Sequence, residues 1–242
     1  MDEPKVYLRF AAELRSFLAP RNRHGQVAVA HDGTSSLGHL IQSLGLPIPE
    51  IGALVADGRD VAHSHRPTAG ETVSIEAPQR PQELPITPPR FLLDVHLGKL
   101  ARRLRLIGVD TAYDNDRDDP ALVVQANAER RVLLTQDRGL LCRRNLWLGA
   151  HVRGTDPDEQ LQDVLERFAP PLAPWTRCTN CNGELAPTGK DEVEHLLQPG
   201  TSRNYDNYGK CSECDRVYWR GAHSRQLEAI VEKATRTVSA HH

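Results

Sequence analysis

The feature that most constrains this chain is a pair of short cysteine motifs in its C-terminal third. Cys178 and Cys181 form one C-x-x-C pair, and Cys211 and Cys214 form a second. Thiolates at this spacing typically place four sulfurs around one tetrahedral zinc ion. Zinc would supply folding free energy that so small a segment cannot obtain from a hydrophobic core. The pattern therefore predicts a structural zinc ribbon, with no coordination position left for a substrate.

The remaining composition is that of an ordinary globular chain. Its 242 residues permit two or three small domains, and a formal net charge of −2 excludes a uniformly positive surface but not a local basic stripe. The fifth cysteine, Cys142, is expected to be a core residue without a nucleophilic role. The chain has no apolar run long enough to cross a bilayer and no secretory signal. We therefore expect a cytoplasmic protein that does not associate with membranes, and the sequence indicates no particular oligomeric state.

Residues 4–77 have the pattern of a small sheet packed against one helix. Hydrophobic and polar residues alternate from Val6 to Phe10, a second strand is predicted at 26–30, and two more at 54–55 and 72–75. A helix is expected to begin at Leu37, behind a capping serine. This order resembles the ubiquitin-like β-grasp fold, including its small sulfur carriers. Those carriers act through a free C-terminal Gly-Gly, whereas this segment continues, so a docking module for a protein partner is the better hypothesis.

The next part of the chain alternates strands and helices. Short apolar strands are predicted at 91–93, 111–113, 132–135 and 149–152, and helices separate them. Repeated strand–helix units favour a parallel sheet with helices on its faces. The domain boundaries expected from the whole sequence are 4–77 for the ubiquitin-like domain, 78–89 for a proline-rich linker, 90–174 for the α/β core, 175–223 for the ribbon and 224–242 for a C-terminal helix or tail.

Acidic residues follow the predicted strands. Asp94 and Asp137 stand at the ends of two strands, and the carboxyl ends of parallel strands share one edge where ligands bind. The loop between them adds Asp114, Asp116, Asp118 and Asp119. Carboxylates that converge repel one another unless they take up protons or bind a cation, for which magnesium or manganese is suited. Helix capping and solvation are the competing explanations for each acid. Asp94-Val95-His96 lacks the Asp-x-Asp of haloacid-dehalogenase-type phosphatases.

Basic and aromatic residues could bind RNA near this edge. The helix after Asp94 carries Lys99, Arg102, Arg103 and Arg105, and Arg138 follows Asp137; their side chains could contact phosphates. Around the second cysteine pair, aromatic side chains could stack on unpaired bases or pack within the ribbon. Packing is favoured for Tyr218.

Three segments carry a resemblance to a known family: F-L-L-D-V-H-L-G-K-L-A-R from residue 91, D-N-D-R-D-D-P-A-L from residue 114, and V-L-L-T-Q-D-R-G-L-L from residue 132. They resemble the Mut7-C domain over about residues 90–223, including its zinc ribbon, and bacterial members also carry an N-terminal ubiquitin-like domain. This family belongs to the PIN-like nucleases, which cleave RNA with clustered acids and divalent metal. The resemblance implies catalytic roles for Asp94, Asp116, Asp119 and Asp137. Trp219, Arg220 and His223 resemble the Y-W-x-G-x-H segment of the same family, and this resemblance implies that they contact RNA or face the metal edge. His96 and Arg103 depart from the family pattern, which commonly has methionine and tryptophan there.

The sequence thus predicts a metal-dependent ribonuclease with catalytic magnesium or manganese at Asp94 and Asp137 and structural zinc at the four cysteines. A loop acid would complete the catalytic site. The alternative is a catalytically silent RNA-binding or scaffold protein with a partner-docking ubiquitin-like domain. A toxin-like ribonuclease is less favoured, because such toxins are usually a lone nuclease domain.

Overall fold

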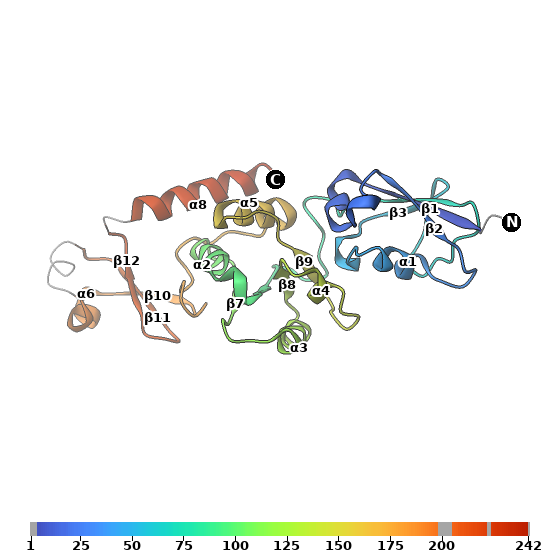
Figure 1. The fold of residues 1–242 in the computed structure, drawn as a ribbon. Helices are drawn as coiled ribbons and strands as arrows, with labels where there is room; N and C mark the ends of the chain where they lie inside the picture. Colours follow the sequence, from blue (N-terminus) through green and yellow to red (C-terminus); the bar gives the residue numbers. More distant parts are fainter. Residues whose placement is uncertain (1–3, 198–204, 222–223, 242) are drawn as a thin grey trace. The chain divides into compact units, whose positions relative to one another are not determined.

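A computed structural model describes residues 4–197, 205–221 and 224–241, and the statements below concern these residues. The chain divides into two compact units (Figure 1). Unit 1 contains residues 1–82 together with 135–151, and unit 2 contains residues 83–134 together with 152–242. Residues 135–151 therefore join the unit of the N-terminal sheet, although the sequence expectation included them in the α/β core.

The N-terminal sheet of unit 1 is mixed and has the strand order β2-β1-β5-β3-β4. Its first strand pairs antiparallel with β2 and parallel with β5, as the alternating pattern of Val6, Leu8 and Phe10 allows when one face is buried. The helix α1 follows a capping Ser36, whose side chain accepts from the His39 N–H. The strands are β1 Lys5–Phe10, β2 Gln26–Ala30, β3 Leu54–Ala56, β4 Arg59–Asp60 and β5 Thr72–Ile75, and the helix is α1 Leu37–Ser43.

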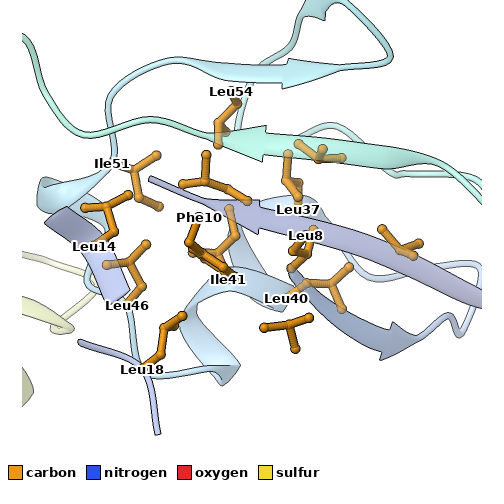
Figure 2. Packing of buried hydrophobic residues seen from close by; sticks show 14 of the residues in the cluster. Leu8, Phe10, Leu14, Leu18, Leu37, Leu40, Ile41, Leu46, Ile51 and Leu54 are labelled. Atoms are coloured by element: carbon orange, nitrogen blue, oxygen red, sulfur yellow. The ribbon is translucent and has the colours of Figure 1, made fainter. Parts of the chain in front are cut away.

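The core of unit 1 lies between the sheet and α1. Figure 2 shows Leu8 and Phe10 of β1 converging with Leu40 and Ile41 of α1. A 3-10 helix that the sequence did not predict adds Leu14 to this core. The 3-10 helices are η1 Ala12–Phe17, η2 Pro20–Asn22 and η3 Ile48–Glu50. The predicted strand–strand–helix–strand–strand order is present, with the short β4 and these 3-10 turns added.

The N-terminal part of unit 1 holds residues 135–151 through specific contacts inside this unit. This segment contains α4 Arg138–Leu141 and β9 Gly149–His151. The Arg138 guanidinium donates to the carbonyls of Ser16 and Phe17 at 3.0 and 3.2 Å and stacks on the Phe17 ring, 5.1 Å from its centroid. The buried Glu50 carboxylate accepts from the His151 N–H at 2.8 Å. These contacts account for the grouping of residues 135–151 with unit 1.

Unit 2 contains a parallel ladder in the order β7-β6-β8, which confirms the parallel sheet and the mixed α/β class. Asp118 and Asp156 cap α3 and α5, and Gly108 ends α2 with a φ of 84°. A Cβ at Gly108 would lie 1.9 Å from the Ala173 carbonyl oxygen, so only glycine fits there. The elements are β6 Phe91–Leu93, η4 Val95–Leu97, α2 Gly98–Leu106, β7 Thr111–Tyr113, α3 Asp119–Glu129, β8 Val132–Thr135 and α5 Pro157–Phe168.

The C-terminal part of unit 2 is a three-stranded antiparallel sheet followed by a long helix. Figure 1 shows α8 lying along α5, and α8 also contacts α2. The Thr237 hydroxyl lies 3.1 Å from the Gln162 side-chain oxygen and links α8 to α5. The elements are β10 Leu185–Thr188, α6 Lys190–Val193, η5 Glu194–Leu196, β11 Tyr208–Cys211, β12 Val217–Trp219 and α8 Ser224–Ser239. Within the described ranges, no helix combines the length and apolar character needed to cross a membrane.

Candidate metal centre and acidic strand ends

The four cysteines of the two motifs converge at one point. Their sulfur atoms all lie within 4.8 Å of one another, with Cys178 and Cys214 at 3.6 Å and Cys181 and Cys211 at 3.4 Å. A tetrahedral site with zinc–sulfur bonds of about 2.3 Å requires sulfur–sulfur distances of about 3.8 Å. Four sulfurs from protein fill all the positions of such a site. The cluster therefore fits a structural zinc ion, as the sequence predicts.

The sulfurs differ in how easily they ionise. Burial opposes ionisation of Cys178, but the Tyr218 hydroxyl at 3.1 Å and the backbone N–H groups of Cys181 and Asn180 outweigh it, so the pKa of Cys178 falls to about 6. Burial and the neighbouring sulfurs raise the pKa of Cys181 to about 12. Crowded thiolates repel one another, and a bound divalent cation removes that cost.

The first cysteine knuckle is fastened to the α/β core by buried polar contacts that the sequence did not reveal. Arg105 of α2, only 2% exposed, donates to the carbonyls of Asn180 at 2.6 Å and Thr179 at 3.3 Å. It also donates to the Thr111 carbonyl at 2.8 Å. The Asn182 side chain in turn accepts from the Thr111 N–H at 2.9 Å. Arg105, grouped by sequence with the phosphate-binding residues, therefore binds the knuckle backbone instead.

An ion pair extends this joint. Asn182 donates to Asp110 at 2.8 Å, and Arg131 pairs with the same carboxylate at 2.7 Å. Burial acts to raise the pKa of Asp110, but the hydrogen bonds from Arg131 and Asn182 outweigh it and hold that pKa below its usual value. The knuckle and the core of unit 2 are thus joined by a connected set of buried and half-buried polar groups.

The strand register of unit 2 brings three strand ends to one edge. Leu93 of β6 is paired with Tyr113 of β7 and with Leu134 of β8. Asp94, 5% exposed, follows β6, and its backbone N–H donates to the Leu134 carbonyl at 3.0 Å. Asp114 follows β7 at the matching position, although the sequence analysis left it out of the catalytic set. The strand register therefore makes Asp114 a further candidate for the acidic site.

The other predicted acids have local roles as well. Asp116 is exposed, and its N–H donates to the Asp114 carboxylate at 3.1 Å. Asp119 is half-buried and begins α3. Asp137 belongs to unit 1, where its carboxylate caps α4 by accepting from the N–H groups of Gly139 at 2.6 Å and Leu140 at 3.3 Å. Among the described residues, only the four cysteines form a group of three or more His, Cys, Asp or Glu side chains close enough together to hold one metal ion.

The predicted RNA-binding residues occupy different environments. Lys99 and Arg102 are exposed on α2, whereas Arg103 forms an ion pair with Asp158 at 2.6 Å. Arg138 is held by carbonyls of unit 1, as described above. The Arg220 guanidinium stacks on the Trp175 ring at 5.1 Å. Trp219 is exposed, and His223 lies outside the described residues.

Comparison with known families agrees with this architecture. The model of the Mut7-C RNAse domain matches residues 89–231, and the model of the Mut7-C ubiquitin domain matches residues 3–83. Neither the curated proteins nor the solved structures include a match to the chain. The first match covers more than half of the chain and includes both the parallel sheet and the ribbon. The chain therefore belongs to the Mut7-C RNAse domain family, with a Mut7-C ubiquitin domain preceding the RNAse domain.

Proposed function

We propose that this protein is a metal-dependent ribonuclease with a PIN-like core, in which carboxylates at one edge of the parallel sheet hold magnesium or manganese. Its family supports a nuclease-type function. The observation that carries the metal-dependent mechanism is the strand register, because it aligns the ends of β7, β6 and β8. Asp94 and Asp114 directly follow two of these strand ends.

Chain connectivity supports the inclusion of Asp137. The Asp94 N–H is bonded to the Leu134 carbonyl, and Asp137 is three residues further along the chain. Three residues span at most about 10 Å when fully extended. The chain therefore limits how far Asp137 can lie from Leu134, and on this ground the proposal includes Asp137 among the metal ligands.

In this mechanism, Asp94 and Asp137 would hold the metal, and Asp116, Asp119 or Asp114 would complete the site. Bound magnesium or manganese would activate a water molecule and stabilise the leaving oxygen of the phosphodiester. Lys99 and Arg102, which are exposed on the helix that follows Asp94, would hold the phosphates of the RNA backbone. Burial of Asp94 lowers the local dielectric and strengthens its attraction for a cation.

The test is RNA cleavage by the purified full chain, with and without added manganese. Asp94→Asn keeps the shape of the side chain and removes its charge. We expect Asp94→Asn to reduce the cleavage rate at least about 100-fold. Loss of a group that only supports a metal ligand typically costs about 10- to 100-fold, and loss of the ligand itself should cost more. Asp191→Asn, at an exposed position of α6, is the matched control and should cleave normally. Equal zinc content in all samples shows that the fold is intact. Equal cleavage by wild type and Asp94→Asn would contradict the proposal.

A second candidate is a silent RNA-binding or scaffold protein. It is favoured by the local role of Asp137, whose carboxylate is already used to cap α4. Binding of RNA by the wild type without cleavage in manganese or magnesium would support this candidate. A separate protein partner for the ubiquitin-like domain stays a prediction, in addition to the intrachain contacts with residues 135–151.

A further inference from the structure

A large cleft opens within unit 2, between helix α2, the ribbon and helix α8. Its volume is about 1030 Å³, at the upper end of the range for ligand-binding pockets. Lys99 and Arg102 of α2, Trp175 of the preceding hinge, Tyr218 and Trp219 of the ribbon and Leu227 of α8 contribute to its wall. We call this space the ribbon cleft.

The wall of the ribbon cleft combines flat aromatic faces with positive charge. Trp219 is 42% exposed and Leu227 is 41% exposed, so part of each apolar side chain is accessible to a ligand. Arg220 stacks on the Trp175 ring, and Arg177 also lines the cleft. Arg103 is neutralised by Asp158, but Lys99 and Arg102 are exposed on the same helix. The cleft therefore suits a ligand with flat apolar faces joined to negative charges.

We propose that the ribbon cleft binds unpaired bases of single-stranded RNA, and this proposal deepens the ribonuclease function on which it rests. Bases would stack on Trp219 and on the part of the Trp175 ring that Arg220 leaves uncovered, and the adjoining phosphates would contact Lys99 and Arg102. Bases within a duplex are already paired and stacked, so their faces are unavailable to the two tryptophans. An acidic peptide would match the charge but would not use the flat aromatic faces.

Arg102 connects this cleft to the strand ends. It also lines a second, polar cavity of about 580 Å³, together with Gly98, Tyr113 and Asp114. Asp114 stands at the end of β7, where the register aligns it with Asp94 at the end of β6. A strand whose bases occupy the ribbon cleft can therefore pass Arg102 and present its next phosphates to the acidic edge. The cleft would select unpaired substrate for that edge.

The experiment measures binding in the absence of magnesium and manganese, so that cleavage does not interfere. The probes are a fluorescently labelled single-stranded RNA of twelve nucleotides and a duplex of the same sequence. We expect Trp219→Ala to weaken single-strand binding roughly 5- to 150-fold, and Trp219→Phe to restore most of the affinity, because each stacked base contributes through an aromatic face. Leu196→Ala is the control, since Leu196 is an exposed apolar residue of unit 2 that does not line the cleft.

Quenching of tryptophan fluorescence by RNA is a second measurement, and it would not occur if Trp219 had only a structural role. Two of the three tryptophans line the cleft, so single-stranded RNA should quench the emission of the wild type. Unchanged affinity in Trp219→Ala, equal binding of duplex and single strand, or equal quenching by polyglutamate would overturn the proposal. If the wild type binds single strands with quenching but never cleaves them, the cleft assignment stands and the ribonuclease function falls.

Discussion

The ribbon and the proposed acidic edge differ in how their side chains are brought together. The four ribbon cysteines come from two short motifs and meet within 4.8 Å. The acids follow separate strands, and the register of β7, β6 and β8 aligns the residues next to them. The first arrangement can be recognised from spacing alone, whereas the second exists only after the sheet has formed.

Because of this difference, we expect the folding of the ribbon to depend on its metal and the folding of the acidic edge not to. The ribbon has a small core of its own and should depend on zinc to fold. The acidic edge belongs to a sheet whose strands Phe91–Leu93 and Val132–Thr135 are fully buried, so it should fold without a divalent cation. Removal of a ligand should therefore unfold the ribbon but leave the edge in place.

The largest expected effect is the loss of zinc. Cys178→Ser should abolish zinc binding and unfold the ribbon, because structural zinc contributes about 10–16 kcal/mol of apparent binding free energy in small zinc domains. Cys142→Ser is the matched control, since the Cys142 sulfur is outside the cluster. Zinc content and thermal unfolding check the prediction. An equally stable ribbon in Cys178→Ser would show that the ribbon does not need zinc to fold, and would contradict this prediction.

The joint between the knuckle and the core should give the next largest effect. Arg105→Met keeps the bulk of the side chain but leaves the carbonyls of Thr111 and Asn180 without their charged donor. We expect a loss of about 2–3 kcal/mol in the free energy of unfolding. Arg102→Met, on the exposed side of the same helix, should change it by no more than about 0.5 kcal/mol. Urea unfolding compares them, and equal effects would show that the buried contacts do not hold the joint.

Acid should weaken the same joint. The pKa of Asp110 is lower in the folded chain than in the unfolded chain, so the stability gained from its ionised form is present above about pH 4, the usual pKa of an unfolded aspartate. That stability is lost as the pH falls through the lower folded pKa. Asp110→Asn should cost about 1–2 kcal/mol at pH 7 and should flatten the decline between pH 5 and pH 3. If the free energy of unfolding of wild type and of Asp110→Asn fell in parallel as the pH is lowered, ionised Asp110 would not be the group that stabilises the joint.

The smallest expected effect on stability belongs to the acidic edge. Without added manganese, Asp94→Asn should change the free energy of unfolding by less than about 1 kcal/mol, because relief of carboxylate repulsion offsets lost contacts of Asp94. Asp163→Asn is a useful contrast, because the buried Asp163 carboxylate accepts from the Arg153 N–H at 2.8 Å and its loss should destabilise unit 2. A large destabilisation by Asp94→Asn would make Asp94 a structural residue.

Sequence patterns predicted the regular elements well, because alternation and capping are local. The strand Gln26–Ala30 and the cap at Ser36 were both predicted from neighbouring residues alone. The 3-10 helix Ala12–Phe17 was missed, because so short a turn has no clear hydrophobic period.

Contacts with residues far away in the sequence give Arg105 and Arg138 partners that the sequence did not indicate. Arg105 looks like part of a basic helix face, but a knuckle more than seventy residues away covers it. Arg138 looks like a phosphate ligand beside Asp137, but carbonyls from the N-terminal 3-10 helix occupy its guanidinium. For the site itself, the roles of the acids after the strands stay predictions, and the register makes Asp114 a further candidate among them.

Manganese binding tests the central claim most directly. Isothermal titration of manganese into the zinc-loaded chain should show binding by the wild type, and at least tenfold weaker binding by Asp94→Asn and Asp137→Asn, because each loses a ligand. Zinc content should stay equal in the three proteins. Identical manganese isotherms for wild type and both variants would contradict the assignment of the acidic edge as a metal site.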